Sequence, residues 1–130
     1  MNDYPERAIR EAEGWLASAR EKLHDVQDEP ALANVCCALA IHAIIRANDA
    51  LSLKHLGIKG TRHDDLAAVF AKLIREGKLP KSDERFGKLL VKAAGDKSGA
   101  DYGKKEFSYE DAEEYVENAE EFVDTVRSRI

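Results

Sequence analysis

The sequence predicts an all-α protein, an antiparallel up-and-down bundle of four to five helices. Apolar residues recur at alternating spacings of three and four over most of the 130 residues, which is the period of one helix face. The period-two alternation of β-branched and aromatic residues that marks strands is absent. Prolines stand only at positions 5, 30 and 80, where they separate the periodic segments. We therefore expect one helical-bundle domain over residues 1–130.

The first helix is expected from Pro5 to about Val26. Proline suits the opening turn of a helix because its missing N–H would have no partner there. The apolar stripe of this helix consists of Ile9, Ala12, Leu16, Ala19, Leu23 and Val26. Trp15 flanks the stripe rather than lying within it.

The second helix is expected from Pro30 to about Leu56, with Gly57 as the residue that follows its end. Residues 35–47 are apolar on nearly every face of this helix. A helix that is apolar all round is buried all round, so we expect this one at the centre of the bundle.

Two shorter helices should follow. The third is expected over about residues 63–77, and the fourth begins after Ser82 or Asp83, either of which can cap it, and ends near Gly95. Residues 96–107 are then expected to form the longest loop, a segment in which functional residues are enriched.

The last helix is expected over Tyr109 to about Arg129. Ser108 is a good N-cap, and Asp111 stands three residues later, which approximates a capping box. Acidic residues crowd the first turns and two arginines close the helix, in agreement with the helix dipole.

The formal net charge of −5 conceals a basic middle segment. Residues 54–105 carry 13 basic and 7 acidic side chains, a net charge of +6, whereas residues 1–53 sum to −4 and residues 106–130 to −7. The middle segment indicates either a surface that faces an anion or pairing with the acidic helices, within the fold or across a dimer.

The two cysteines are adjacent, at Cys36 and Cys37. Inside a helix their side chains diverge by about 100°, so we expect two small buried hydrophobic residues rather than a disulfide. Free thiols and the lack of a signal peptide favour the cytoplasm. The longest apolar run, residues 35–41, is too short to span a membrane.

One polar group is predicted on the central helix. His42, Arg46 and Asp49 follow the spacing i, i+4, i+7 and therefore share a face. They form either a slot for an anionic ligand, with Arg46 as the phosphate partner, or an internal Arg46–Asp49 pair with His42 hydrogen-bonded nearby. A third interpretation is that the helix turns outward here, because Asn48, Ser52 and Lys54 follow.

Two further candidate sites lie outside the central helix. Lys97, Asp101 and Tyr102 fall in the expected long loop, where the lysine would contact phosphate and the tyrosine would stack on a base. Alternatively, Tyr102 packs the loop on the bundle and Asp101 caps a turn. Arg62 and His63 stand at the expected start of the third helix, where free N–H groups favour anions, or they are simply exposed.

Several of these segments together resemble a known family. They are Ala38-Leu-Ala-Ile-His-Ala-Ile-Ile-Arg-Ala-Asn-Asp-Ala-Leu, the Gly57 turn before His63-Asp-Asp-Leu, Ala100-Asp-Tyr-Gly, and Ala119-Glu-Glu-Phe-Val. Over nearly the whole chain the pattern is similar to the HEPN family, the higher eukaryotes and prokaryotes nucleotide-binding domains.

The resemblance implies a bundle of four to five helices that usually forms a homodimer. Many members are RNA-cleaving toxins or nuclease modules, some pair with a small nucleotidyltransferase antitoxin, and others bind nucleotides. Catalytic members carry an Arg, four to six residues and then a His. The histidines here are at 24, 42, 55 and 63, and no Arg lies five to seven residues before any of them. We therefore assign no catalytic residue, and we expect no metal site and no cofactor.

The leading hypothesis is a cytoplasmic HEPN-like module, a dimer that binds RNA, a nucleotide or a nucleotidyltransferase partner through its basic middle segment. It would be a toxin–antitoxin component that lacks the usual ribonuclease motif. One alternative is a ribonuclease with divergent catalytic groups drawn from His42, Arg46, Lys97 and Tyr102. The other is a protein-interaction or dimerisation domain without a ligand.

Overall fold

The computed structural model describes residues 3–57 and 66–130, and in these ranges it contains five α-helices and no strand. This confirms the all-α prediction. The elements are α1 (Pro5–Val26), η1 (Pro30–Leu32), α2 (Ala33–Leu56), α3 (Leu66–Arg75), η3 (Lys81–Phe86), α4 (Gly87–Tyr102) and α5 (Tyr109–Arg129).

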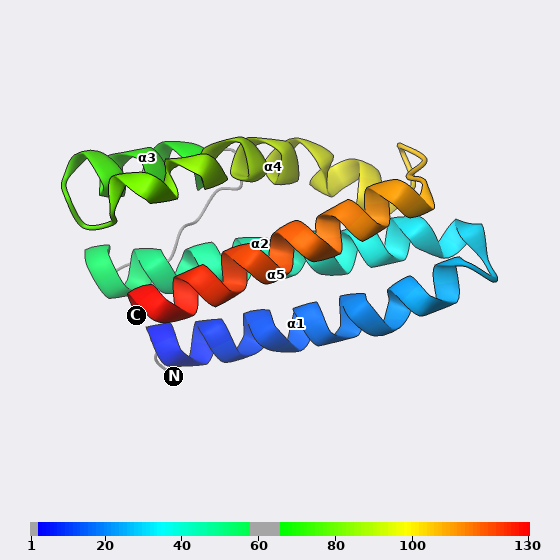
Figure 1. Ribbon diagram of the computed structural model, residues 1–130, viewed down its shortest axis with the longest axis horizontal. Coiled ribbons are helices and arrows are strands. Elements are labelled where there is room, and N and C mark those ends of the chain that lie inside the picture. The colour runs from blue at the N-terminus through cyan, green and yellow to red at the C-terminus, as the bar shows by residue number, and fades with distance from the viewer. Residues whose placement is uncertain (1–2, 58–65) are drawn as a thin grey trace.

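The four long helices, α1, α2, α4 and α5, alternate in direction, as in an up-and-down bundle. Figure 1 shows α1 and α4 running one way and α2 and α5 running the other, with the N- and C-termini at the same end. The helix α2 packs mainly against α1 and α5, and α4 covers a further side of it. The short helix α3 packs against α4, so these two form an outer layer.

The core is built around α2, as the sequence predicts. Ile41, Ile44 and Leu51 of this helix are fully buried. Phe122 of α5 joins the outer layer to the core, because its ring contacts those of Phe70 at 6.1 Å and Phe86 at 5.1 Å between centroids. The helix is nevertheless not buried on every side, because Val35, near its start, is 42% exposed.

The segment Pro30–Leu56, which comprises η1 and α2, is long and apolar enough by length and composition to cross a membrane. Half of its most apolar window is buried inside the bundle, however. A core helix of a globular protein passes the same test, and the position of α2 among four other helices accounts for its composition.

Two predicted helix ends are confirmed. Gly57 follows α2 in the left-handed conformation, with φ = 73°, and its N–H donates to the carbonyl of Leu53. At the start of α5, Ser108 Oγ accepts a hydrogen bond from Asp111 N at 3.1 Å, and Ser108 N donates to Asp111 Oδ2 at 2.9 Å. These hydrogen bonds outweigh partial burial and hold the pKa of Asp111 below its ordinary value.

The predicted start and end of the fourth helix are wrong. Neither Ser82 nor Asp83 caps a helix, because residues 81–86 form the 3₁₀ segment η3 and Asp83 is buried. The α-helix that follows passes Gly95 and ends at Tyr102. The expected long loop of residues 96–107 is therefore mostly helical.

Tertiary contacts explain why α4 continues. Asp96 accepts a hydrogen bond of 2.6 Å from the Tyr115 hydroxyl of α5, and Ala100 is buried. Gly99 lets the chain return closely, because a Cβ built on it would lie 2.9 Å from Cβ of Lys105. These contacts outweigh the low helix propensity of glycine.

Candidate functional site

The structure brings two separately predicted groups together around His42. The Nε2 atom of His42, on α2, lies 3.4 Å from Oδ1 of Asp101, at the end of α4. The other carboxylate oxygen of Asp101 accepts a hydrogen bond of 2.7 Å from Lys97 Nζ. Trp15 of α1 stacks on the imidazole, with ring centroids 5.0 Å apart and planes inclined by 28°. Since Trp15 is 41% exposed, this cluster reaches the surface.

Arg46 lies one turn further along the same face and is surrounded by carboxylates. Its guanidinium donates to Glu11 at 2.6 and 2.9 Å, to Asp3 at 2.9 and 3.0 Å, and to Asp49 at 3.2 Å. Burial by itself would lower the pKa of Arg46, but the hydrogen bonds to Asp3, Glu11 and Asp49 outweigh it and raise that pKa. The structure thus contains the internal Arg46–Asp49 pair that the sequence offered as an alternative.

The helix α2 does not turn outward at Asn48 and Ser52, so that interpretation is wrong for both, and only Lys54 of the three residues is exposed. Asn48 and Ser52 are almost completely buried. Asn48 Oδ1, Ser52 Oγ and His55 Nε2 lie along one face of the helix, and none of the three atoms has a hydrogen-bond partner in the described chain. The sequence showed polar residues here without showing that they point inward.

The remaining predicted residues do not join this cluster in the described chain. Tyr102 ends α4 rather than lying in a loop, and it is 73% exposed with the ammonium of Lys104 5.8 Å from its ring centroid. It therefore does not pack a loop on the bundle, and Asp101 does not cap a turn. Arg62 and His63 lie outside the described residues.

The basic middle segment forms an outer surface of the molecule. Residues 66–95 expose seven Lys or Arg side chains and only two carboxylates. These seven cations, here termed the basic surface, are Lys72, Arg75, Lys78, Lys81, Arg85, Lys88 and Lys92. Within the described ranges only Arg85 has a carboxylate partner, Glu121 of α5. The basic residues therefore do not pair extensively with the acidic helices of the same chain.

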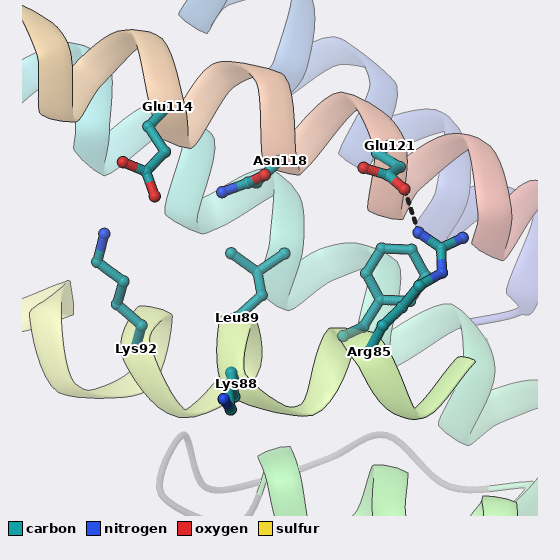
Figure 2. A pocket seen from close by; sticks show the side chains of 8 residues that line it. Arg85, Lys88, Leu89, Lys92, Glu114, Asn118 and Glu121 are labelled. Atoms are coloured by element: carbon teal, nitrogen blue, oxygen red, sulfur yellow. Dashed lines mark hydrogen bonds and ion pairs between the residues drawn. The ribbon is translucent and has the colours of Figure 1, made fainter. Parts of the chain in front are cut away.

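A cleft of about 390 Å³ runs between α4 and α5 beside this surface. Figure 2 shows Arg85 and Lys92 projecting from the α4 side toward Glu121 and Glu114 on α5, with Leu89 opposite Asn118 between them. The ammonium of Lys92 lies 4.7 Å from the ring centroid of Tyr115. Sequence analysis did not identify this cleft.

The comparison with protein families agrees with the arrangement of helices. The family model of the HEPN domain matches residues 5–129, from the start of α1 to the end of α5. The protein belongs to the HEPN family. A comparison with curated proteins gave no significant match. The HEPN bundle of this chain thus places His42 beside Asp101, and it presents the basic surface on the layer of α3 and α4.

Proposed function

We propose that this HEPN protein is a cytoplasmic RNA-binding module that holds the RNA backbone on its basic surface. The observation that carries the proposal is the set of exposed cations on α3, η3 and α4, which lack carboxylate partners in the described chain except at Arg85. Such cations are hydrated and available to phosphates, whose binding releases counterions from the RNA.

The charge distribution supports a polyanion such as RNA as the ligand of this surface. The helix α5 carries eight acidic and two basic side chains and α1 is nearly neutral, so the strongest positive charge of the described chain lies on the α3–α4 layer. A polyanion that approaches the protein is therefore directed toward this one layer. Binding of this kind depends steeply on salt and little on base sequence.

Fluorescence anisotropy with a labelled single-stranded RNA, measured at several salt concentrations, tests the proposal. The double variant Lys81→Glu/Lys88→Glu reverses one charge on η3 and one on α4. It should raise the Kd for RNA about tenfold or more at 50 mM salt. The slope of log K against log salt should fall by about 1.4, because each contact to a single strand contributes about 0.7.

A matched control is the double variant Arg10→Glu/Arg20→Glu on α1, which makes the same change of charge at two exposed positions away from the basic surface. It should leave the salt slope unchanged. No binding by the unmodified protein at 50 mM salt, or an equal loss in both double variants, contradicts the proposal.

Two further expectations from the family belong to this proposal. The protein would act as a homodimer, and a nucleotidyltransferase encoded nearby would be its protein partner in a toxin–antitoxin pair. Sedimentation analysis at micromolar concentration tests the first, and co-purification with the neighbouring gene product tests the second. A strict monomer with no retained partner would reduce the function to RNA binding alone.

A divergent ribonuclease is the second candidate, and the His42–Asp101 contact favours it. A carboxylate 3.4 Å from one imidazole nitrogen orients the ring, which leaves the other nitrogen as a candidate general base toward an RNA 2′-hydroxyl. If this function is correct, pure protein degrades RNA, and His42→Ala and Asp101→Asn abolish the activity. Degradation that persists in His42→Ala would reject His42 as a catalytic group.

A further inference from the structure

The two walls of the α4–α5 cleft are matched residue by residue. Along η3 and α4 the cleft-lining positions 85, 89 and 92 follow the spacing i, i+4, i+7, and positions 121, 118 and 114 follow the same spacing in reverse along α5. Because the two helices are antiparallel, Arg85 faces Glu121 and Lys92 faces Glu114 (Figure 2). The cleft therefore has a cationic wall and a carboxylate wall.

At one end of the cleft the opposite charges form an ion pair, and at the other end they do not. Arg85 and Glu121 form an ion pair that bridges the cleft at one end. At the other end Lys92 and Glu114 face each other but are not within ion-pair distance, and the Lys92 ammonium is held over the ring of Tyr115. An ammonium and a carboxylate thus remain separate across an open gap.

The charge balance of this gap selects a ligand that is neutral overall. An anion is attracted by Lys92 but repelled by Glu114, whereas a cation is attracted by Glu114 but repelled by Lys92. A ligand with both charges satisfies both side chains at once. Lys88 also lines the cleft, but Figure 2 shows its side chain directed away from α5.

We propose that the α4–α5 cleft binds a small zwitterion, an amino-carboxylate whose carboxylate meets Lys92 and whose ammonium meets Glu114. Leu89 supplies an apolar floor for the methylene chain that joins the two charges. Asn118, in the middle of the α5 wall, offers an amide to a polar group on that chain. The cleft volume of about 390 Å³ lies within the range of small-molecule sites.

The proposal can be tested by an NMR titration of backbone amides with a series of ω-amino acids, glycine, β-alanine and 4-aminobutyrate. These probes carry the same two charges at increasing separation. At least one should shift amides of α4 and α5 in a saturable manner, with Kd on the order of millimolar. Butyrate and n-butylammonium carry only one of the charges and should bind at least about tenfold more weakly.

Two variants locate the site. Lys92→Met and Glu114→Gln should each weaken the best zwitterion about tenfold or more, because each removes one charge-assisted contact. Lys104→Met, beyond the end of α4, and Glu117→Gln, on α5 but outside the cleft lining, make the same chemical changes and should leave Kd unchanged. Circular dichroism confirms that each variant is folded.

The outcomes are distinct. Unchanged affinity in both cleft variants, equal binding of butyrate and 4-aminobutyrate, or no saturable shift with any zwitterion up to about 100 mM overturns the proposal. Zwitterion binding and RNA binding can be told apart, since Lys81→Glu lies outside the cleft lining and should weaken RNA binding while leaving the zwitterion titration unchanged.

Discussion

Arg129, the last residue of α5, forms two hydrogen bonds with Asp83 in η3, from Nη2 to Oδ1 at 2.8 Å and from Nε to Oδ2 at 2.9 Å. The Asp83 side chain is 2% exposed, so the hydrogen bonds from this guanidinium replace those that water would make to its carboxylate. The hydrogen bonds to Asp83 raise the pKa of Arg129. The pair connects the end of α5 to η3, the segment between the two helices of the outer layer.

Loss of this arginine should destabilise the protein. Arg129→Met leaves a buried carboxylate without its partner and should lower the free energy of unfolding by about 2–3 kcal/mol. Urea denaturation measures the change. Arg127→Met, which breaks an exposed pair with Glu13, is the matched control and should have little effect. Equal effects of the two substitutions would show that Asp83 does not depend on Arg129.

Two glycines of the same helix should respond oppositely to alanine. At Gly95 nothing lies within 4 Å of an added Cβ, so Gly95→Ala should stabilise the protein by about 0.5–1 kcal/mol. At Gly99 the added Cβ would lie 2.9 Å from Lys105 Cβ. Gly99→Ala should therefore displace the segment between α4 and α5 and should not increase the stability. Thermal unfolding compares them, and equal stabilisation by both would contradict the close approach.

Stability should decrease as the pH falls, partly because of His55. Burial, followed by the positive charges of Lys54 and Lys78, lowers the pKa of this imidazole below its ordinary value of 6.5. The unfolded chain therefore binds the proton more readily, and the contribution of His55, complete above pH 6.5, is lost as the pH drops through that value toward the lower folded pKa.

Urea titrations at pH 7.5 and 5.5 test this effect. His55→Gln should reduce the loss of stability between the two pH values, whereas His24→Gln, at an exposed position near the end of α1, should not. A pH dependence in His55→Gln identical to that of the unmodified protein would assign the effect to other groups.

The thiols should be inert while the protein is folded. Burial raises the pKa of Cys36 to about 11 and that of Cys37 to about 12, so almost no thiolate exists at pH 8. Cys36 also donates its S–H to the carbonyl of Ala19. Reaction with a disulfide reagent should be slow in buffer and fast in urea. Rapid reaction of the folded protein would show that α2 separates from α1.

Local patterns were sufficient to predict most of the helices. The stripe of α1 and the Ser108 capping box depend on neighbours within one or two turns, and both are confirmed. The end of α4 could not be predicted in this way, because it depends on a contact between Asp96 and Tyr115, 19 residues apart. The glycines at positions 95 and 99 favour a turn, but the tertiary contacts of Asp96 and of the following residues keep this segment helical.

The candidate site shows the same limit. Spacing placed His42 and Arg46 on one face correctly, but the carboxylates beside them come from distant segments, Asp101 at the end of α4 and Asp3 before α1. The +6 middle segment did indicate an exposed basic surface. The cleft depends on the antiparallel register of α4 and α5, which no single helix reveals.

The central position of α2 has a consequence for synthesis of the protein. Its apolar faces are covered by α1, which precedes it, and by α5, which follows about 50 residues later. A nascent chain that stops before residue 109 leaves one side of the most apolar helix bare, and bare surfaces of this kind aggregate. Truncated products should therefore be recognised by chaperones and degraded, so that only chains that include α5 yield folded protein.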